Sequence, residues 1–374
     1  MTFVPGFNLQ EAEPLLALLG VLEADPLPAD IPPLPPLTSP PGWKIVFDSQ
    51  SIGPFDNRWQ LAKSPQEQYA VLIRGTVAEA GSVIDDLLSV MIPATSQIEL
   101  SSLTLNYQLA ASNNTSAGIH LGFALAMLIL MYDPFKGILW QLLETVPEGS
   151  DVFIAGHSQG AAIATLLRSY LHYLNLFDGT RMGTFYNYKS YVFAQPKPGN
   201  DLYGIDYDVV AGNGGLAFTV NNSQDWVPQV PFTIEVLSDI NVPNPVSVEL
   251  ESHALTALVL KEVQAEADAL RTGIAKLQKA KHTPNMMALA GIFQDPKFQQ
   301  KVLGQPVPQG LTLGFPILPP ILPTLNFAGC GSVYGLLGTP GVNPCKSNDS
   351  FWQHHAAMYS VLLNGMPVPA ECNG

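Results

Sequence analysis

The stretch "DVFIAGHSQGAAIATLL", residues 151–167, changes character at its middle. Residues 151–155 form an apolar run typical of a buried strand, and the residues after Gly160 follow a helical pattern. At the junction, Ser158 stands between Gly156 and Gly160. Small flanking residues let a backbone turn tightly enough to expose a serine, and the helix that follows points its first N–H groups at the same place. The alternative is an ordinary tight turn that contains a serine. The surrounding sequence distinguishes between these two interpretations.

Strands and helices alternate on either side of that turn. Strands are predicted over 43–49, 67–75, 151–156, 188–196 and from 216 onward, and helices over 118–146 and 159–174. Such alternation indicates an α/β fold built on a mostly parallel sheet. The chain has 374 residues, of which 47% are hydrophobic, so it can bury a sizeable core.

The first 42 residues do not follow this alternation. Residues 24–41 are rich in proline, a composition typical of extended chain. We therefore predict an N-terminal proline-rich arm over 1–42 and a single domain over 43–374.

A second departure begins at about residue 237. Thr283-Pro284 and Asp295-Pro296 are typical of helix starts within a long helical region. Residues 311–328 carry no charge, and their four prolines exclude a regular helix. We expect a helical and proline-rich cap insertion over 237–330, after which residues 350–365 return to a helical pattern.

The composition narrows the set of partners. The net charge is −14 and no basic tract occurs, which argues against binding to nucleic acid or to an anionic membrane. The longest apolar run, 121–132, is too short to span a bilayer. Cys330, Cys345 and Cys372 lack the spacing of a metal site, so they form either one disulfide with one cysteine left over or three thiols.

A serine nucleophile needs a base to accept its proton, an acid to orient that base, and hydrogen-bond donors for the oxyanion formed on attack. Arg74-Gly75-Thr76 ends a predicted strand and offers such donors. Asp225 lies in a loop that follows another predicted strand, which is where an α/β sheet places its orienting acid.

Together these pieces resemble the class 3 (fungal-type) lipase family of α/β-hydrolases. The resemblance covers about 43–231 and the end of the chain. It rests on five stretches in the family's order: Arg74-Gly75-Thr76; His120 with Gly122 and Phe123; Gly156-His157-Ser158-Gln159-Gly160; Pro196-Lys197-Pro198-Gly199-Asn200; and Asn222, Asp225, Val227 and Pro228. It implies the α/β-hydrolase fold, with His120 in a structural role.

The resemblance also implies a catalytic triad of Ser158, Asp225 and a C-terminal histidine. The family's base often stands four residues before a tyrosine, which favours His355, followed by Tyr359. His354 is adjacent to it, and His253 lies nearer to Asp225 in the sequence, so both stay open as alternatives. The oxyanion hole is expected from the Thr76 and Gln159 backbone N–H groups with the Thr76 hydroxyl, and no metal or organic cofactor is expected.

The expected reaction is hydrolysis of carboxylic esters of lipids, as in a triacylglycerol lipase. A short-chain or medium-chain carboxylesterase, a phospholipase A1, or a non-catalytic lipid-binding relative are the alternatives. Candidate acyl-binding side chains in the proline-stiffened stretch are Phe315, Ile317, Leu318, Ile321 and Leu322.

A mobile lid at a lipid interface is expected either from helix 253–281, whose pattern is amphipathic, or from residues 77–100. The alternative for that helix is simple packing of the insertion onto the domain. A secreted protein is favoured, although no signal peptide is visible because the first cationic side chain is Lys44.

Overall fold

The structure is a computed structural model, and it describes residues 3–23, 34, 36–75, 90–212, 214–240, 248–250, 252–304, 314–338 and 351–367, without the side chains of 278–280. Its centre is a seven-stranded sheet in the order β1-β2-β3-β8-β9-β11-β13. The strands are β1 (Lys44–Asp48), β2 (Trp59–Lys63), β3 (Tyr69–Ile73), β8 (Asp151–His157), β9 (Asn187–Phe193), β11 (Ala217–Asn222) and β13 (Ser332–Leu336). From β3 to β13 neighbouring strands are parallel, while β2 is antiparallel to both β1 and β3. The mostly parallel sheet expected from the sequence is therefore confirmed.

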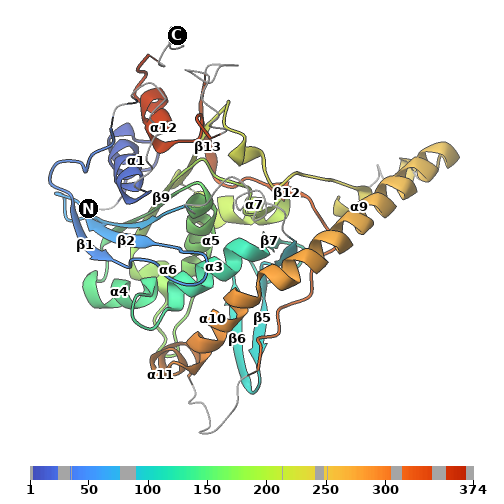
Figure 1. Ribbon diagram of the computed structural model, residues 1–374, viewed down its shortest axis with the longest axis horizontal. Helices are drawn as coiled ribbons and strands as arrows, with labels where there is room; N and C mark the ends of the chain where they lie inside the picture. Colours follow the sequence, from blue (N-terminus) through green and yellow to red (C-terminus); the bar gives the residue numbers. More distant parts are fainter. Residues whose placement is uncertain are drawn as a thin grey trace.

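Helices cover both faces of this sheet (Figure 1). Because side chains alternate along a strand, Val71 and Ile73 of β3 enter one core cluster while Ala70 and Leu72 enter the other. The first cluster includes buried side chains of α3 (Leu121–Tyr132), α4 (Ile138–Thr145), α5 (Gln159–Tyr173) and α10 (Thr283–Gln294). The second joins α1 (Leu9–Glu23) and α12 (Ala356–Leu363), which lie side by side on the opposite face.

Smaller elements surround the main sheet. A four-stranded sheet runs in the order β12 (Phe327–Ala328), β10 (Gly199–Asn200), β7 (Gly118–His120) and β4 (Met91–Pro93). A hairpin consists of β5 (Thr95–Leu100) and β6 (Leu103–Gln108). The short helices are α6 (Met182–Phe185), α7 (Asp201–Tyr207) and α11 (Pro296–Phe298).

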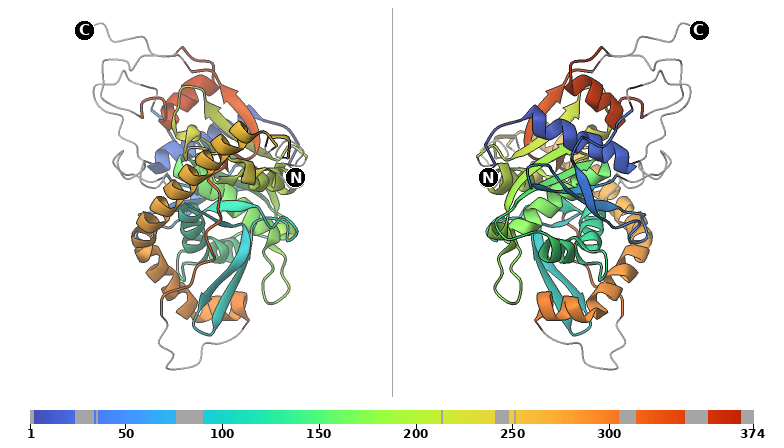
Figure 2. Two further views of the ribbon diagram at one scale, coloured as in Figure 1. Left: turned by 90° about the vertical axis from the view of Figure 1, so that its right-hand side faces the viewer. Right: turned by 90° about the vertical axis from the view of Figure 1, so that its left-hand side faces the viewer.

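The stretch predicted as a cap insertion, 237–330, contributes helices to one side of the molecule. Its longest element is α9 (Ala254–Lys281), followed by α10, which packs on α3. Figures 1 and 2 show α9 on the side of the molecule away from α1. After α11 the chain runs past the hairpin, where Ile317 pairs with Glu99 of β5, and then enters β13. Among the described residues, no helix combines the length and apolar character needed to cross a bilayer.

The N-terminal segment differs from the predicted arm. Residues 9–23 form helix α1, in which Leu15, Leu16 and Leu19 are fully buried. The repeated leucines give this helix an apolar side that packs on the sheet, so it belongs to the domain. Most of the proline-rich stretch 24–41 lies outside the described residues.

The long helix predicted over 118–146 was also wrong in extent. Residues 118–120 form β7, and the helical part is divided into α3 and α4. The break follows Asp133, whose extended backbone precedes Pro134, because proline disfavours a helical conformation in the residue before it. His120 ends β7 and caps α3 by accepting the Phe123 N–H at Nδ1, which is a structural contact of the kind expected for it.

Candidate active site

Ser158 sits at a strained turn between β8 and α5. Its backbone has φ 57° and ψ −134°, a conformation that L side chains rarely adopt. The two glycines of the motif are required by close packing. A Cβ at Gly156 would come within 2.1 Å of the Gly160 carbonyl oxygen, and one at Gly160 within 2.2 Å of the Ile73 carbonyl oxygen. The turn therefore has the tightness expected of a nucleophile elbow.

A continuous hydrogen-bonded chain links this serine to a buried acid through His354. The Ser158 Oγ lies 2.8 Å from His354 Nε2, and His354 Nδ1 lies 2.7 Å from Asp225 Oδ2. Asp225 is only 2% exposed. Its Oδ1 accepts the Val227 N–H at 2.9 Å, and its Oδ2 also accepts the Tyr359 hydroxyl at 2.8 Å. The three side chains thus have the serine–base–acid order that nucleophilic acyl transfer requires.

The surroundings keep Asp225 ionised. Burial alone would raise the pKa of this carboxyl, but attraction to His354 and hydrogen bonds from His354, Val227 and Tyr359 lower it below its ordinary value. Burial and the neighbouring Asp225 raise the pKa of Tyr359 well above its ordinary value, so its hydroxyl keeps the proton that it donates. An ionised acid whose oxygens accept from fixed donors can hold the imidazole with its proton on Nδ1.

The structure corrects the sequence-based choice of base. His354 lies between Ser158 and Asp225, whereas His355 is the N-cap residue of α12, where its carbonyl accepts the Met358 and Tyr359 N–H groups. The four-residue spacing to Tyr359 therefore favoured the wrong histidine. Tyr359 contacts Asp225, and His354, five residues before Tyr359, completes the hydrogen-bonded chain. His253 lies at the start of α9 beside Glu249, with its side chain 67% exposed, and is not part of the site.

The loop that carries His354 is fixed by Asn222, at the end of β11. The Asn222 side-chain N–H group donates to both the Gln353 carbonyl and the Gln353 side chain at 2.9 Å. The Asn222 backbone N–H donates to the Tyr359 hydroxyl at 3.1 Å. The asparagine of the Asn222–Asp225 motif therefore anchors the base loop, a role that only the folded chain reveals.

Only part of the predicted oxyanion hole lies within the described residues. Gly75 lies against the elbow, since a Cβ there would come within 2.9 Å of the Ser158 Cβ. Gln159 is the first residue of α5, so its backbone N–H has no acceptor within the helix. Thr76 lies outside the described residues, as do residues 77–89 of the lid candidate 77–100, while 91–93 and 95–100 form β4 and β5.

A large apolar cavity of about 1180 Å³ lies between helices α9 and α10 and residues 315–323. Four of the five predicted acyl-binding side chains line it, together with residues of α9, α10 and the start of α3. These four are Phe315, Ile317, Leu318 and Ile321. Leu322 is absent from the lining and packs against the main core, and its backbone N–H donates to the Met91 carbonyl. Burial lowers the pKa of His282, which also lines the cavity, to about 4, so its ring is neutral near pH 7.

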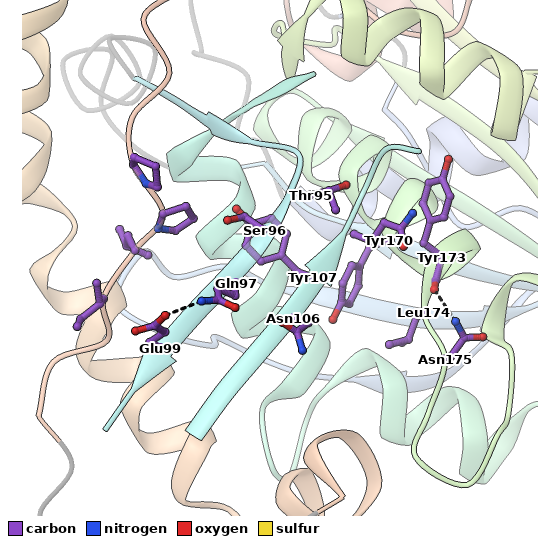
Figure 3. Close-up of a pocket in the computed structure, with 15 residues that line it drawn as sticks. Thr95, Ser96, Gln97, Glu99, Asn106, Tyr107, Tyr170, Tyr173, Leu174 and Asn175 are labelled. Carbon is purple, nitrogen blue, oxygen red and sulfur yellow. Dashed lines mark hydrogen bonds between the residues drawn. The ribbon is translucent and has the colours of Figure 1, made fainter. Parts of the chain in front are cut away.

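A second hollow of about 710 Å³ is more polar (Figure 3). It lies between the β5–β6 hairpin and the end of α5, and Gln97, Asn106 and Asn175 are among its lining side chains. Residues 317–320 separate it from the apolar cavity, because Ile317, Leu318 and Pro319 line both. None of the three side chains of the serine–histidine–aspartate chain lines this hollow or the apolar cavity.

The parallel sheet, the strained serine turn and the buried acid–base pair together define an α/β-hydrolase with a serine-hydrolase type of site. Comparison with known proteins agrees, since residues 70–235 match the family described as "Lipase (class 3)". The resemblance to class 3 lipases seen in the motifs is confirmed over this range. The matched range contains Ser158 and Asp225 but ends well before His354.

Curated relatives include lipases of Malassezia species. A secreted mono- and diacylglycerol lipase of Malassezia restricta is 26% identical over 187 residues, which cover 50% of this chain and 54% of that protein. A secreted mono- and diacylglycerol lipase of Malassezia globosa is 33% identical over 113 residues, which cover 30% of this chain and 33% of that protein. The chain thus matches about half or less of the length of these relatives.

Solved structures of fungal lipases are similar at a lower level. The lipase of Rhizomucor miehei in its propeptide complex has 19% identity and a TM-score of 0.41, covering 60% of this chain and 62% of that one. The lipase of Rhizopus microsporus var. chinensis has 19% identity and a TM-score of 0.40, covering 62% of this chain and 73% of that one.

Proposed function

We propose that this protein is a serine ester hydrolase of the lipase type, which cleaves carboxylic esters of lipids through an acyl-enzyme on Ser158. The observation that carries the proposal is the hydrogen-bonded chain Ser158–His354–Asp225, with contacts of 2.8 and 2.7 Å. A serine next to an oriented imidazole can be deprotonated as it attacks, which an isolated serine hydroxyl cannot achieve near neutral pH.

In the proposed reaction, the Ser158 Oγ attacks the ester carbonyl carbon while His354 Nε2 accepts the hydroxyl proton. The negative charge that develops on the carbonyl oxygen is stabilised by the backbone N–H groups of Gln159 and Thr76. His354 then gives its proton to the leaving alcohol oxygen, and the acyl group stays on Ser158. A water molecule, deprotonated by His354, attacks the acyl-enzyme and releases the acid.

For the substrate we propose acylglycerols with long acyl chains. The apolar cavity next to the insertion suits an alkyl chain, because its lining is dominated by Phe315, Ile317, Ile321 and neighbouring apolar side chains. The names of the Malassezia relatives point to the same class, since both are called mono- and diacylglycerol lipases. In this proposal residues 237–330 act as a substrate-binding cap.

We also propose that the protein is secreted and acts at a lipid interface. Both relatives named above are called secreted. On α9, Leu255, Leu258, Val259 and Val263 are each between 46% and 75% exposed, and their spacing places them on one side of the helix. Such a row can contact lipid without crossing a bilayer.

The test is hydrolysis of p-nitrophenyl esters from acetyl to palmitoyl, followed by emulsified mono-, di- and triacylglycerols. Wild-type protein should be active, and Ser158→Ala and His354→Ala should be inactive. An optimum at acetyl or butyryl esters would favour a carboxylesterase, and cleavage of phospholipid alone would favour a phospholipase. Absence of any ester hydrolysis would leave a non-catalytic lipid-binding protein.

The cavity is tested by Ile321→Glu, which places a carboxylate in the apolar lining. Its matched control is Val333→Glu on β13, where the side chain is 71% exposed and outside the cavity. The ratio of palmitoyl to acetyl ester hydrolysis should fall about tenfold in Ile321→Glu only, because a pocket discriminates chain length by a few kcal/mol at most. An unchanged ratio would exclude this cavity as the acyl site.

A further inference from the structure

The histidine of the elbow motif is buried and fully engaged, although the proposed reaction does not use it. The His157 side chain is 3% exposed and lies beneath the Ser158 turn. Its Nε2 is 2.9 Å from the His354 carbonyl oxygen, and its Nδ1 is 2.9 Å from Glu23 Oε1. The ring thus connects the backbone of the proposed base to a carboxylate from the N-terminal helix.

The positions of the protons follow from these partners. A carbonyl oxygen can only accept, so His157 Nε2 carries a hydrogen. The contact between Nδ1 and Glu23 Oε1 holds one further proton between the ring and the carboxyl group. Glu23 and His157 therefore form a buried hydrogen-bonded pair whose ring donates to the His354 carbonyl. The rings of His354 and Tyr359 also lie beside this ring, with centroid distances of 4.8 and 5.8 Å.

The position of Glu23 in its helix favours a hydrogen-bond partner for the carboxyl group. It is the last residue of α1, where the helix dipole disfavours negative charge, and the last turn of α1 has no basic residue. The first turn of the same helix carries Glu11, which pairs with the fully buried Lys189 of β9. Both ends of α1 thus place an acidic side chain against a buried side chain of the main sheet.

Residues 351–355, which hold His354, form turns rather than a helix or a strand, so side-chain contacts help to fix their position. On one side, the Asn222 side chain binds the Gln353 carbonyl, and on the other, His157 binds the His354 carbonyl. Asp225 then orients the His354 ring. Loss of the His157 contact would leave a buried carbonyl without its partner and free the backbone on one side of the base.

We infer that Glu23 and His157 are positioning residues, through which the N-terminal helix holds His354 within reach of Ser158. This inference rests on the proposed function. It assigns a role in the reaction to α1, which lies entirely outside the range that matches the class 3 lipases. Displacement of a reacting group by about 1 Å can lower the rate about 100-fold, which sets the scale of the effect.

The test compares Glu23→Ala, His157→Ala and His157→Gln with the control Glu13→Ala, which changes an exposed acid of the same helix. Each kcat is measured on p-nitrophenyl butyrate and divided by the amount of serine titrated with a fluorophosphonate, so that unfolded protein does not count. We expect kcat to fall about 10- to 100-fold in Glu23→Ala and His157→Ala, with KM nearly unchanged. His157→Gln, whose amide N–H can still donate to the His354 carbonyl, should recover most of the His157→Ala loss.

Equal kcat per titrated serine in Glu23→Ala and Glu13→Ala would overturn the inference. So would a loss in His157→Ala that His157→Gln does not recover, because that result indicates core packing. Failure of the proposed function is distinguishable, since it would show as a wild-type protein that neither hydrolyses esters nor reacts with the fluorophosphonate.

Discussion

Replacing Asp225 by asparagine tests the proposed mechanism at its most buried point. In the wild type, Asp225 Oδ1 accepts the Val227 N–H, while Oδ2 accepts from both His354 Nδ1 and the Tyr359 hydroxyl. If the asparagine oxygen keeps the Val227 contact, its NH₂ group faces His354 Nδ1. That nitrogen must then be an acceptor, so the imidazole proton moves to Nε2 and blocks removal of the proton from Ser158.

The opposite orientation of the amide does not restore the site. It would place the NH₂ group against the Val227 N–H and leave that buried donor without an acceptor, at a cost of about 1–3 kcal/mol. The preferred orientation is therefore the inactive one. A wrong tautomer in a serine–histidine–aspartate site lowers kcat by about 10⁴-fold, which corresponds to about 5 kcal/mol in the activation barrier.

The assay is kcat on p-nitrophenyl butyrate at pH 8, with thermal unfolding measured in parallel. The control is Asp178→Asn, which changes an exposed acid paired with Lys301 and should leave activity unchanged. If Asp225→Asn keeps kcat within tenfold of the wild type while folded, the tautomer argument is refuted and Asp225 is only a structural acid.

Three further predictions concern the same site. His354→Ala should lower kcat by at least 10³-fold, and His355→Ala should stay within a few-fold of the wild type, as measured by initial rates; the reverse result would restore His355 as the base. Ser158→Gly should be inactive yet raise the free energy of unfolding by about 1 kcal/mol in urea titrations, because glycine relieves the positive φ of 57°, and a decrease would show that the turn is unstrained. Because the pKa of Asp225 in the folded state lies below its ordinary 3.8, its ionised form stabilises the fold above about pH 4, and this contribution is lost as the pH falls toward the folded pKa. Tyr359→Phe removes one hydrogen bond that lowers the pKa of Asp225, so its urea midpoint should be lower than that of the wild type at pH 7. Between about pH 5 and pH 3, the midpoint of the variant should fall less than that of the wild type. A parallel pH dependence of the two midpoints would contradict this coupling.

Much of the sheet and one half of the site could be read from local patterns. The run 151–155, the small residues beside Ser158 and the helical pattern after Gly160 lie within one short stretch, so neighbouring residues alone determine that turn. Helix α1 was not predicted, because the proline-rich stretch after it led us to assign all of 1–42 to an arm. The leucines of this helix nevertheless repeat with helical spacing.

The base was harder to predict because it lies 129 residues from its acid along the chain. Two adjacent histidines have nearly the same local sequence, and the choice between them depends on where α12 begins. His355 caps that helix, while His354 lies one residue before it in the loop, beside Asp225. A difference of one residue redirects a side chain completely, and no local pattern records which direction faces the serine.

The sequence by itself determined the alternating fold, the serine turn and the acid-bearing loop, because each depends on residues that are close along the chain. Only the tertiary structure decided that His354 is the partner of Ser158, that Asn222 fixes the base loop, and that Glu23 reaches the elbow through His157. These contacts join segments more than 100 residues apart. They exist only once the sheet has brought the ends of its parallel strands to one edge and α1 and α12 have packed on the same face.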